Sequence, residues 1–190
     1  MPILLFCTAL EAKSIMPKLL AVEASKNIDL FALAGSREVQ KEEDLKTELK
    51  EGELFETDFI GASEGDCQAW ALEQMGRFNS LDKQLIAIAD KRSAQDQTIV
   101  MQFYNEEPGL EFPGHGTLPP EQGKWYSFRI KYEDTFTLDS ALSYGAFDVV
   151  YPTYFGRKDL LTDDQGIFDV QKAQRMSIGK ETDVEGETAQ

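Results

Sequence analysis

Two short, almost wholly apolar runs constrain the fold of this chain more than any other feature of its sequence. The run Ile-Leu-Leu-Phe-Cys covers residues 3–7, and the run Gln-Leu-Ile-Ala-Ile-Ala covers residues 84–89. A strand without a polar face is typical of a parallel sheet whose two faces are both covered by helices. The two runs therefore predict a layered α/β protein with these strands at its centre.

Four further segments have the composition and alternation of strands, namely residues 29–34, 53–59, 97–105 and 124–132. The connection between residues 84–89 and 97–105 is too short for a crossover helix, so these two strands are expected to pair antiparallel. The prediction is an α/β fold with a mixed β-sheet of about six strands. An N-terminal βαβαβαβ portion is followed by antiparallel strands, and helices pack on the sheet.

The first expected helix follows the strand at residues 3–7. Thr8 and Glu11 match the capping-box pattern that begins a helix. Pro17 has two interpretations: it kinks this helix, or it lies in the first turn of a second start that Ser14 caps. Both interpretations place the apolar side of the helix against the sheet.

Two more helices are expected, over residues 37–51 and 64–78, and they differ in how much apolar surface they present. The first is mostly charged and has a narrow inward stripe. The second follows Ser63, a favourable N-cap residue, and has a broad stripe. The stripes consist of Val39, Leu45 and Leu49 in the first helix, and of Cys67, Trp70, Ala71, Met75 and Phe78 in the second.

The length of 190 residues suits one domain with an extension. We expect a single α/β domain over residues 1–175, of which residues 1–52 form an N-terminal βαβα element. The remaining residues, 176–190, are expected to be an acidic, disordered tail, because residues 181–190 hold four carboxylates and no Lys or Arg.

A long segment at residues 106–123 has the composition of an irregular loop, with four prolines and four glycines. Loops of this length are typically either functional or disordered. Beyond residue 132 the pattern is weak. There we expect a strand or turn near residues 135–138, a short helix near 147–156 and a last ordered segment at 167–170.

The charge balance restricts the partners of the protein. It has 34 acidic and 19 basic residues, which gives a net charge of −15. Such a chain repels nucleic-acid phosphates and anionic lipid headgroups, so neither nucleic acid nor a membrane is an expected partner. Two cysteines, Cys7 and Cys67, do not form a disulfide framework, and the N-terminus shows no targeting signal. We expect a soluble cytoplasmic protein.

Two aspartates stand just past the ends of predicted strands. Asp58 closes the strand at residues 53–59, and Asp90 follows residues 84–89. Ligands of open α/β sheets bind at the carboxyl ends of the strands, where two carboxylates bind a divalent cation or share a proton as acid and base. Arg92 and Ser93 would then orient an anion beside them. The alternative is that each aspartate only stabilises a turn, a common role of this residue.

Two other residues are candidates for a site. His115 is the only histidine of the chain and lies between two glycines in the long loop, so it is the only side chain with an ordinary pKa near neutrality. The alternative is an exposed loop tip. Trp125 begins a segment crowded with aromatic residues, which form either core and sheet surface or an exposed patch for a partner or an apolar small molecule.

Several established motifs are excluded. The sequence has no CxxC pair and one histidine, which excludes a structural zinc site, and we predict no metal ligand set and no cofactor beyond a divalent cation at the aspartates. A calcium loop around Gly166 fails because its first and last positions would be Leu161 and Lys172. Phosphate-binding and dinucleotide glycine patterns are absent from the sequence, as is a G-x-S-x-G nucleophile elbow.

A resemblance connects several short motifs. In chain order they are TDF (57–59), AW (69–70), LIAIAD (85–90), DQTIVMQFYNEEPG (96–109), FRI (128–130) and DDQGIF (163–168). Residues 53–170 resemble a family of small, mostly bacterial proteins known only as a domain of unknown function. Relative to that family, residues 110–123 and 150–162 are insertions. The resemblance implies a shape and no activity.

The leading functional hypothesis is a non-enzymatic binding or protein-interaction module that acts through the surface of residues 108–160. It rests on the lack of a catalytic constellation with the residue types and spacing that known chemistries need. Its partner is either a protein or a small molecule. The alternative is an enzyme that uses Asp58 and Asp90, with metal assistance and with Arg92 and His115 as helpers.

Overall fold

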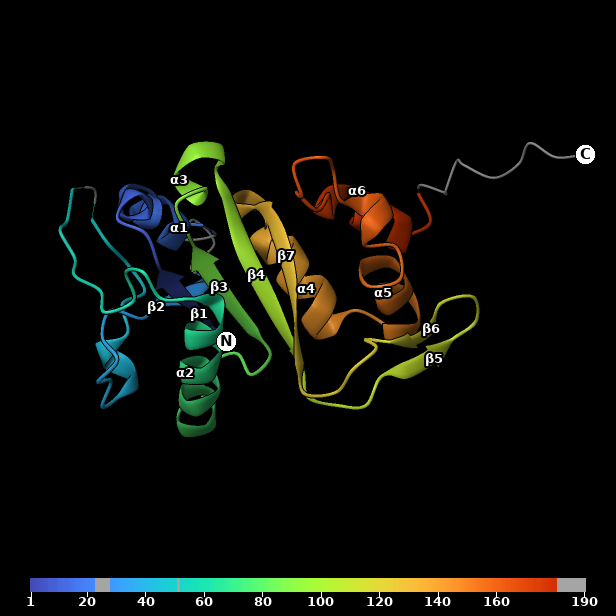
Figure 1. The fold of residues 1–190 in the computed structure, drawn as a ribbon, viewed down its shortest axis with the longest axis horizontal. Helices are drawn as coiled ribbons and strands as arrows, with labels where there is room; N and C mark the ends of the chain where they lie inside the picture. Colours follow the sequence, from blue (N-terminus) through green and yellow to red (C-terminus); the bar gives the residue numbers. More distant parts are fainter. Residues whose placement is uncertain (23–27, 51, 181–190) are drawn as a thin grey trace, which may run out of the picture.

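Five strands form one mixed sheet at the centre of the protein (Figure 1). The computed structural model describes residues 1–22, 28–50 and 52–180. From one edge of the sheet to the other, the strands are β2 (Phe31–Leu33), β1 (Ile3–Cys7), β3 (Leu85–Ala89), β4 (Thr98–Asn105) and β7 (Lys124–Lys131). β1 pairs parallel with β2 and β3, whereas β4 pairs antiparallel with β3 and β7. The predicted mixed α/β architecture is confirmed.

Helices and a small hairpin complete the fold. The described residues contain the α-helices α1 (Met16–Leu20), α2 (Glu64–Arg77), α3 (Ser93–Asp96), α4 (Thr135–Tyr144), α5 (Phe147–Tyr154) and α6 (Val170–Ser177). They also contain the 3₁₀ helices η1 (Glu11–Ile15), η3 (Glu42–Asp44), η4 (Tyr132–Asp134) and η5 (Asp159–Leu161). β5 (Leu110–Phe112) and β6 (Gly116–Leu118) form a separate hairpin.

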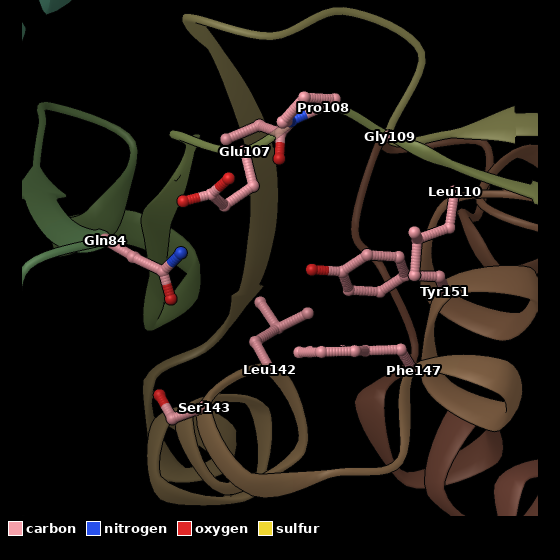
Figure 2. Close-up of a pocket in the computed structure, with 10 residues that line it drawn as sticks. Gln84, Glu107, Pro108, Gly109, Leu110, Leu142, Ser143, Phe147 and Tyr151 are labelled. Carbon is pink, nitrogen blue, oxygen red and sulfur yellow. The ribbon is translucent and has the colours of Figure 1, made fainter.

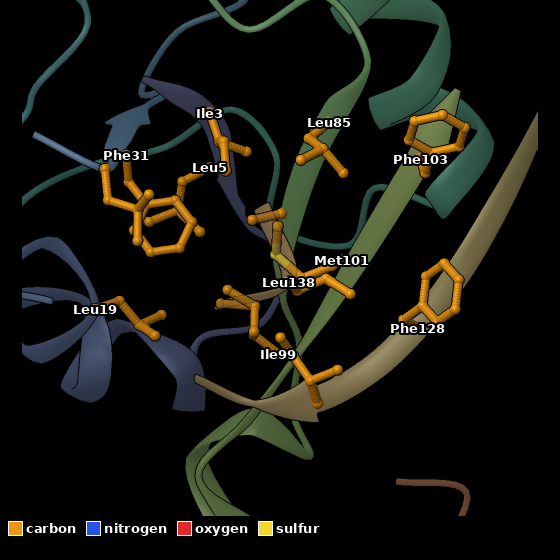
Figure 3. Packing of buried hydrophobic residues seen from close by; sticks show 14 of the residues in the cluster. Ile3, Leu5, Leu19, Phe31, Leu85, Ile99, Met101, Phe103, Phe128 and Leu138 are labelled. Atoms are coloured by element: carbon orange, nitrogen blue, oxygen red, sulfur yellow. The ribbon is translucent and has the colours of Figure 1, made fainter. Parts of the chain in front are cut away.

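Both faces of the central strands are buried, as their apolar composition predicts. Along β1, Ile3 and Leu5 enter the core that α1, α4, α5 and α6 cover, where Leu138 of α4 also lies (Figure 3). Leu4 and Phe6 point to the opposite side and pack with residues of α2. Because neighbouring residues of a strand face opposite ways, every residue of the run is buried by one layer or the other.

The helix expected over residues 64–78 is confirmed as α2. Ser63 caps it: its hydroxyl accepts a hydrogen bond from the N–H of Asp66 at 3.1 Å, and the Asp66 carboxylate accepts the N–H of Ser63 at 2.9 Å. This reciprocal pair satisfies two N–H groups that a helix start otherwise leaves open. The buried face of α2 includes Trp70, whose ring packs edge-on against Phe6 of β1.

The first helix begins later than the capping-box pattern indicates. Thr8 does not cap it; its N–H and its hydroxyl both donate to the carbonyl of Ala89, which extends the contact between β1 and β3. The helical segment consists of η1 followed by α1, and Pro17 lies in the first turn of α1. The second-start interpretation of Pro17 therefore holds, although Ile15 rather than Ser14 precedes α1.

The helix expected over residues 37–51 is wrong. Among its described residues only η3 is helical, and Lys46 instead exchanges backbone hydrogen bonds with Leu33 at the end of β2. The Asp44 carboxylate accepts two backbone N–H groups of its own segment, an alternative to helical bonding that short acidic side chains offer. The predicted inward residues are buried all the same, but their stripe is too narrow to offset the cost of helix nucleation.

The strand expected over residues 53–59 is also wrong. Among the described residues, a single backbone hydrogen bond connects this segment to the chain that leaves β2, from the Asp58 N–H to the Gly35 carbonyl at 3.0 Å. In a regular strand Phe55 and Phe59, four residues apart, would lie on the same face. Here they are buried on opposite sides of the sheet, so the segment is not a regular strand. The N-terminal portion is therefore β1–α1–β2–α2–β3, one β-α unit shorter than predicted.

The C-terminal half differs from the expectations in three places. Part of the long loop forms the β5–β6 hairpin, and α4 occupies residues 135–138, where a strand or turn was expected. The helix near 147–156 is confirmed as α5. At residues 167–170, Phe168 forms an isolated bridge with Thr162 and Val170 begins α6, which runs past the predicted domain end. Most of the predicted acidic tail, residues 181–190, lies outside the described residues.

The helices of the described ranges are short. None of them combines the length and the apolar character that crossing a bilayer requires.

Candidate binding site

Asp90 is part of an ion pair that connects the end of β3 to β7 across the intervening strand β4. It follows β3, and its Oδ1 accepts hydrogen bonds from the N–H and the hydroxyl of the buried Ser93, at 2.9 and 3.0 Å. Arg129 of β7 reaches it across β4 and binds both carboxylate oxygens, while also donating to Thr98 at 2.9 Å. Burial of the carboxyl favours its neutral form, but the bonds from Arg129 and Ser93 outweigh this, so the pKa of Asp90 is lowered.

Asp58 has a different set of partners. Its Oδ2 accepts the N–H of Arg37 at 2.9 Å and the hydroxyl of Ser36 at 3.0 Å, and these bonds lower the pKa of this exposed carboxyl. The arrangement is the turn-stabilising one that the sequence left open as an alternative.

The two aspartates lie at the same end of the sheet, where β2 and β3 finish, but they do not share a hydrogen-bond partner. Asp58 is bonded to the chain that leaves β2, and Asp90 to the chain that leaves β3, with β1 between the two strands. Two strand spacings amount to about 10 Å. Within the described ranges no cluster of three or more His, Cys, Asp or Glu side chains is arranged to bind a metal ion. The geometry therefore supports two separate structural roles.

Arg92 and Ser93 are engaged locally. Arg92 forms an i,i+4 ion pair with Asp96, with Nε 2.5 Å from Oδ2. The Ser93 hydroxyl accepts the N–H of Asp90 at 3.0 Å in addition to its bond to the carboxylate. Both residues thus stabilise the turn into α3.

His115 and Trp125 lie at the other end of the sheet. β4 runs antiparallel to β3, so the β5–β6 hairpin that follows β4, with His115 in its turn, is remote from Asp90 (Figure 1). The His115 ring packs on the backbone of Gly156, where a Cβ atom would approach Nδ1 to 2.6 Å. Trp125 lies near the start of β7, opposite Tyr104 of β4, and the two rings are in contact with centroids 5.0 Å apart and planes tilted by 44°. The predicted site residues therefore do not converge.

A pocket of about 420 Å³ opens at the end of the sheet where β3 begins and β4 ends. Figure 2 shows its walls, which come from the start of β3, the loop after β4, β5 and the helices α4 and α5. The lining residues are Gln84, Asn105, Glu107, Pro108, Gly109, Leu110, Leu142, Ser143, Phe147 and Tyr151. Eight of these ten fall between residues 107 and 151, within or next to the stretch where the sequence predicts an interaction surface.

One wall of the pocket is apolar and aromatic. The rings of Phe147 and Tyr151, one helical turn apart on α5, lie with centroids 5.0 Å apart, and Leu142 of α4 extends this wall. The Tyr151 hydroxyl points into the space towards Gln84 and Glu107 (Figure 2). Burial raises the pKa of Tyr151, so its hydroxyl remains a hydrogen-bond donor at neutral pH.

The polar side of the pocket carries negative charge. Glu107 is the charged residue of the lining, and no Lys or Arg is present among the described residues that form it. Behind Ser143, whose hydroxyl donates to Asp139 at 3.0 Å, the pKa of Asp139 is raised by burial and then by the carboxylate of Asp82. The electrostatic surroundings of the pocket therefore favour a cation over an anion.

A close backbone approach shapes the rim. A Cβ atom at Gly109 would come within 2.2 Å of the Pro119 carbonyl oxygen, so only glycine allows the two ends of the hairpin to lie this close. Asn105 anchors the same region by donating from Nδ2 to the Glu121 carbonyl at 3.0 Å. The proline and glycine content of the loop was the sequence signal for this region, but its contact with α4 and α5 has no local signature.

Comparison of the chain with family models, with curated proteins and with solved structures found no match, so the resemblance of residues 53–170 to a domain of unknown function stays a prediction.

Proposed function

We propose that this protein is a non-enzymatic binding module that holds a small organic cation with an apolar body in the pocket between the loop after β4 and the helices α4 and α5. The observation that carries the proposal is the position of the Glu107 carboxylate opposite the wall formed by Phe147 and Tyr151.

The size and lining of the pocket support a small molecule. A volume of about 420 Å³ lies within the range of roughly 300–1,000 Å³ that small-molecule sites occupy. Such sites are mostly apolar with a few convergent polar groups. Leu142, Phe147 and Tyr151 supply the apolar wall here, and Gln84 and Glu107 supply polar groups on the facing side.

The charge of the pocket and of the whole chain supports a cation. A net charge of −15 concentrates cations around the protein and repels anions. Inside the pocket, an ammonium group near Glu107 gains an ion pair, and the faces of aromatic rings such as that of Phe147 attract cations. An anionic ligand would meet repulsion from the same groups.

The competing hypothesis, an enzyme that uses Asp58 and Asp90, has less support. Each of these carboxylates accepts hydrogen bonds from its own backbone and side-chain partners. Asp58 is bound to the chain that leaves β2, whereas Asp90 lies at the end of β3. A cytoplasmic location, which is part of the proposal, is supported by Cys7 and Cys67, which are both unpaired and buried.

The test compares three probes that share one phenylethyl body and differ in charge: phenethylamine, phenethyl alcohol and phenylacetate. Dissociation constants are measured by NMR titration of the full chain. We expect the order phenethylamine, then phenethyl alcohol, then phenylacetate, from tightest to weakest. Glu107→Gln should weaken phenethylamine binding about fivefold, as befits one partly exposed ion pair, and should leave phenethyl alcohol unchanged.

Glu106→Gln is the matched control, because Glu106 is the exposed neighbour of Glu107 and does not line the pocket. Phe147→Ala should weaken all three probes. Equal binding of the three probes, or equal effects of the Glu106 and Glu107 substitutions, would overturn the proposal.

A further inference from the structure

Three polar side-chain groups of the pocket between the loop after β4 and the helices α4 and α5 specify the kind of cation that fits it, an inference that rests on the function proposed above. They are the Gln84 amide before β3, the Glu107 carboxylate after β4 and the Tyr151 hydroxyl on α5. Figure 2 shows the three around the same space. None of them has a hydrogen-bond partner among the described residues.

The three groups are open to a ligand. Glu107 is exposed and Gln84 is partly buried. Tyr151 as a whole is only 9% exposed, but its hydroxyl points into the pocket (Figure 2). A few polar groups that converge on a mainly apolar pocket are the ones that fix the orientation of a ligand. Because the protein itself supplies no partner for these groups, their convergence indicates a ligand with several hydrogen-bonding atoms.

All three groups can accept a hydrogen bond. A carboxylate is an acceptor only, an amide oxygen is an acceptor, and a hydroxyl oxygen accepts while it donates its own proton. A primary ammonium group has three N–H donors and no acceptor, so its requirements match these three groups in number and in kind. Hydrogen bonds from a charged donor are also stronger than those between neutral groups.

A quaternary ammonium group fits the same pocket less well. Cations of that kind are bound in cages of aromatic faces. Of the described residues that line this pocket, two are aromatic, Phe147 and Tyr151, and both belong to α5, with ring planes 37° apart. They form one wall and not a cage. N-methyl groups would lie against the oxygens of the facing side and leave them without donors, which costs binding free energy.

We propose that the pocket is specific for primary amines in their protonated form: the ammonium group donates to the Glu107 carboxylate, the Gln84 amide oxygen and the Tyr151 hydroxyl, while the apolar body of the ligand lies along Phe147.

The experiment compares phenethylamine with its N,N-dimethyl and N,N,N-trimethyl derivatives, which keep the phenylethyl body and the single positive charge but lose N–H donors stepwise. Dissociation constants are measured by NMR titration of the full chain. We expect binding to weaken along the series, with the trimethyl compound about tenfold weaker than phenethylamine. Gln84→Met removes the amide at similar length and should weaken phenethylamine about fivefold while the trimethyl compound binds as before.

Gln40→Met is the matched control, because Gln40 is exposed and does not line the pocket. The Gln84 variant also separates hydrogen bonding from steric exclusion, since a purely steric penalty on the methyl groups would leave the ratio of the two dissociation constants unchanged in Gln84→Met. An unchanged ratio therefore overturns the inference.

The outcomes for the original protein distinguish this inference from the function on which it rests. If the three amines bind equally and all more tightly than phenethyl alcohol, the pocket is a cation site without preference for primary amines, and the inference is overturned while the proposed function stands. If none of them binds more tightly than phenethyl alcohol, the proposed function is overturned and the inference with it.

Discussion

Arg129 on β7 binds Asp90 at the end of β3 across the whole width of β4. The side chain of Arg129 is 15% exposed and that of Asp90 is 33% exposed, so the pair is partly shielded from solvent. It connects the antiparallel part of the sheet to the parallel part, at the turn that precedes α3.

Removing the charge of Asp90 should destabilise the fold. Asp90→Asn leaves the guanidinium of Arg129 without its counter-ion, and we expect the free energy of unfolding to fall by about 2 kcal/mol. Urea denaturation measures the loss. Asp58→Asn is the control, because its carboxyl lies in an exposed turn and should cost less. A larger loss in Asp58→Asn than in Asp90→Asn would contradict the assignment of the stronger structural role to Asp90.

The same pair should make stability depend on pH in acid. Because the pKa of Asp90 is lower in the folded protein than in the unfolded chain, its contribution is fully present above the unfolded pKa of about 3.9. It is lost as the pH falls through the folded pKa. The difference in unfolding free energy between the original protein and Asp90→Asn should therefore be constant near neutrality and narrow below about pH 4. A difference that widens on acidification would refute this sign.

Two glycine substitutions should have opposite effects. Gly109→Ala places a methyl group 2.2 Å from the Pro119 carbonyl oxygen, so we expect a loss of about 2 kcal/mol and a disturbed pocket rim. Gly76→Ala, in α2, meets nothing within 4 Å and should stabilise the protein by about 0.5–1 kcal/mol through helix propensity. Thermal unfolding of the two variants checks both signs. Equal midpoints would show that Gly109 is not sterically required.

Removing the unpartnered hydroxyl of Tyr154 should stabilise the ligand-free protein. Tyr154→Phe keeps the buried ring and removes an oxygen that has no hydrogen-bond partner among the described residues, so we expect a gain of about 1 kcal/mol. Differential scanning calorimetry of the two proteins measures it. A loss of stability would indicate that the hydroxyl already has a partner.

The strands and helices that were predicted correctly share one property. Their apolar residues need only a covering layer, and any α/β arrangement provides one. The run at residues 3–7 has no polar face, so it requires cover on both sides, and β1 is covered on both sides. Residues 64–78 carry both a cap and a broad apolar stripe, and they form α2. The short connection after β3 left no room for a crossover, and β4 is antiparallel.

The predictions that failed depended on competition between alternatives of similar energy. Residues 37–51 have helical spacing, but a bridge between Lys46 and Leu33 and side-chain bonds from Asp44 replace the helix. Residues 53–59 alternate like a strand, yet Phe55 and Phe59 reach opposite cores. Such outcomes depend on which neighbours are present, and a local pattern contains no information about them.

The candidate site shows the same division. Asp90 was identified from its place after a strand, but its partner Arg129 lies 39 residues further along the chain. The pocket brings together Gln84, Glu107 and Tyr151. The sequence indicated a long Pro- and Gly-rich loop and a cluster of aromatic residues, but it did not indicate that the two are in contact. The partner that each group meets depends on packing over long sequence separations.

By itself, the sequence determined the class of this protein, because runs without a polar face can be buried only inside layers, and the direction of β4, because a short connection excludes a crossover. Only the tertiary structure decided which acidic and basic side chains form ion pairs, which segments remain outside the sheet and where pockets form. Those features depend on small differences in free energy between alternative contacts of residues distant in the sequence. These contacts form only when the helices pack on the sheet.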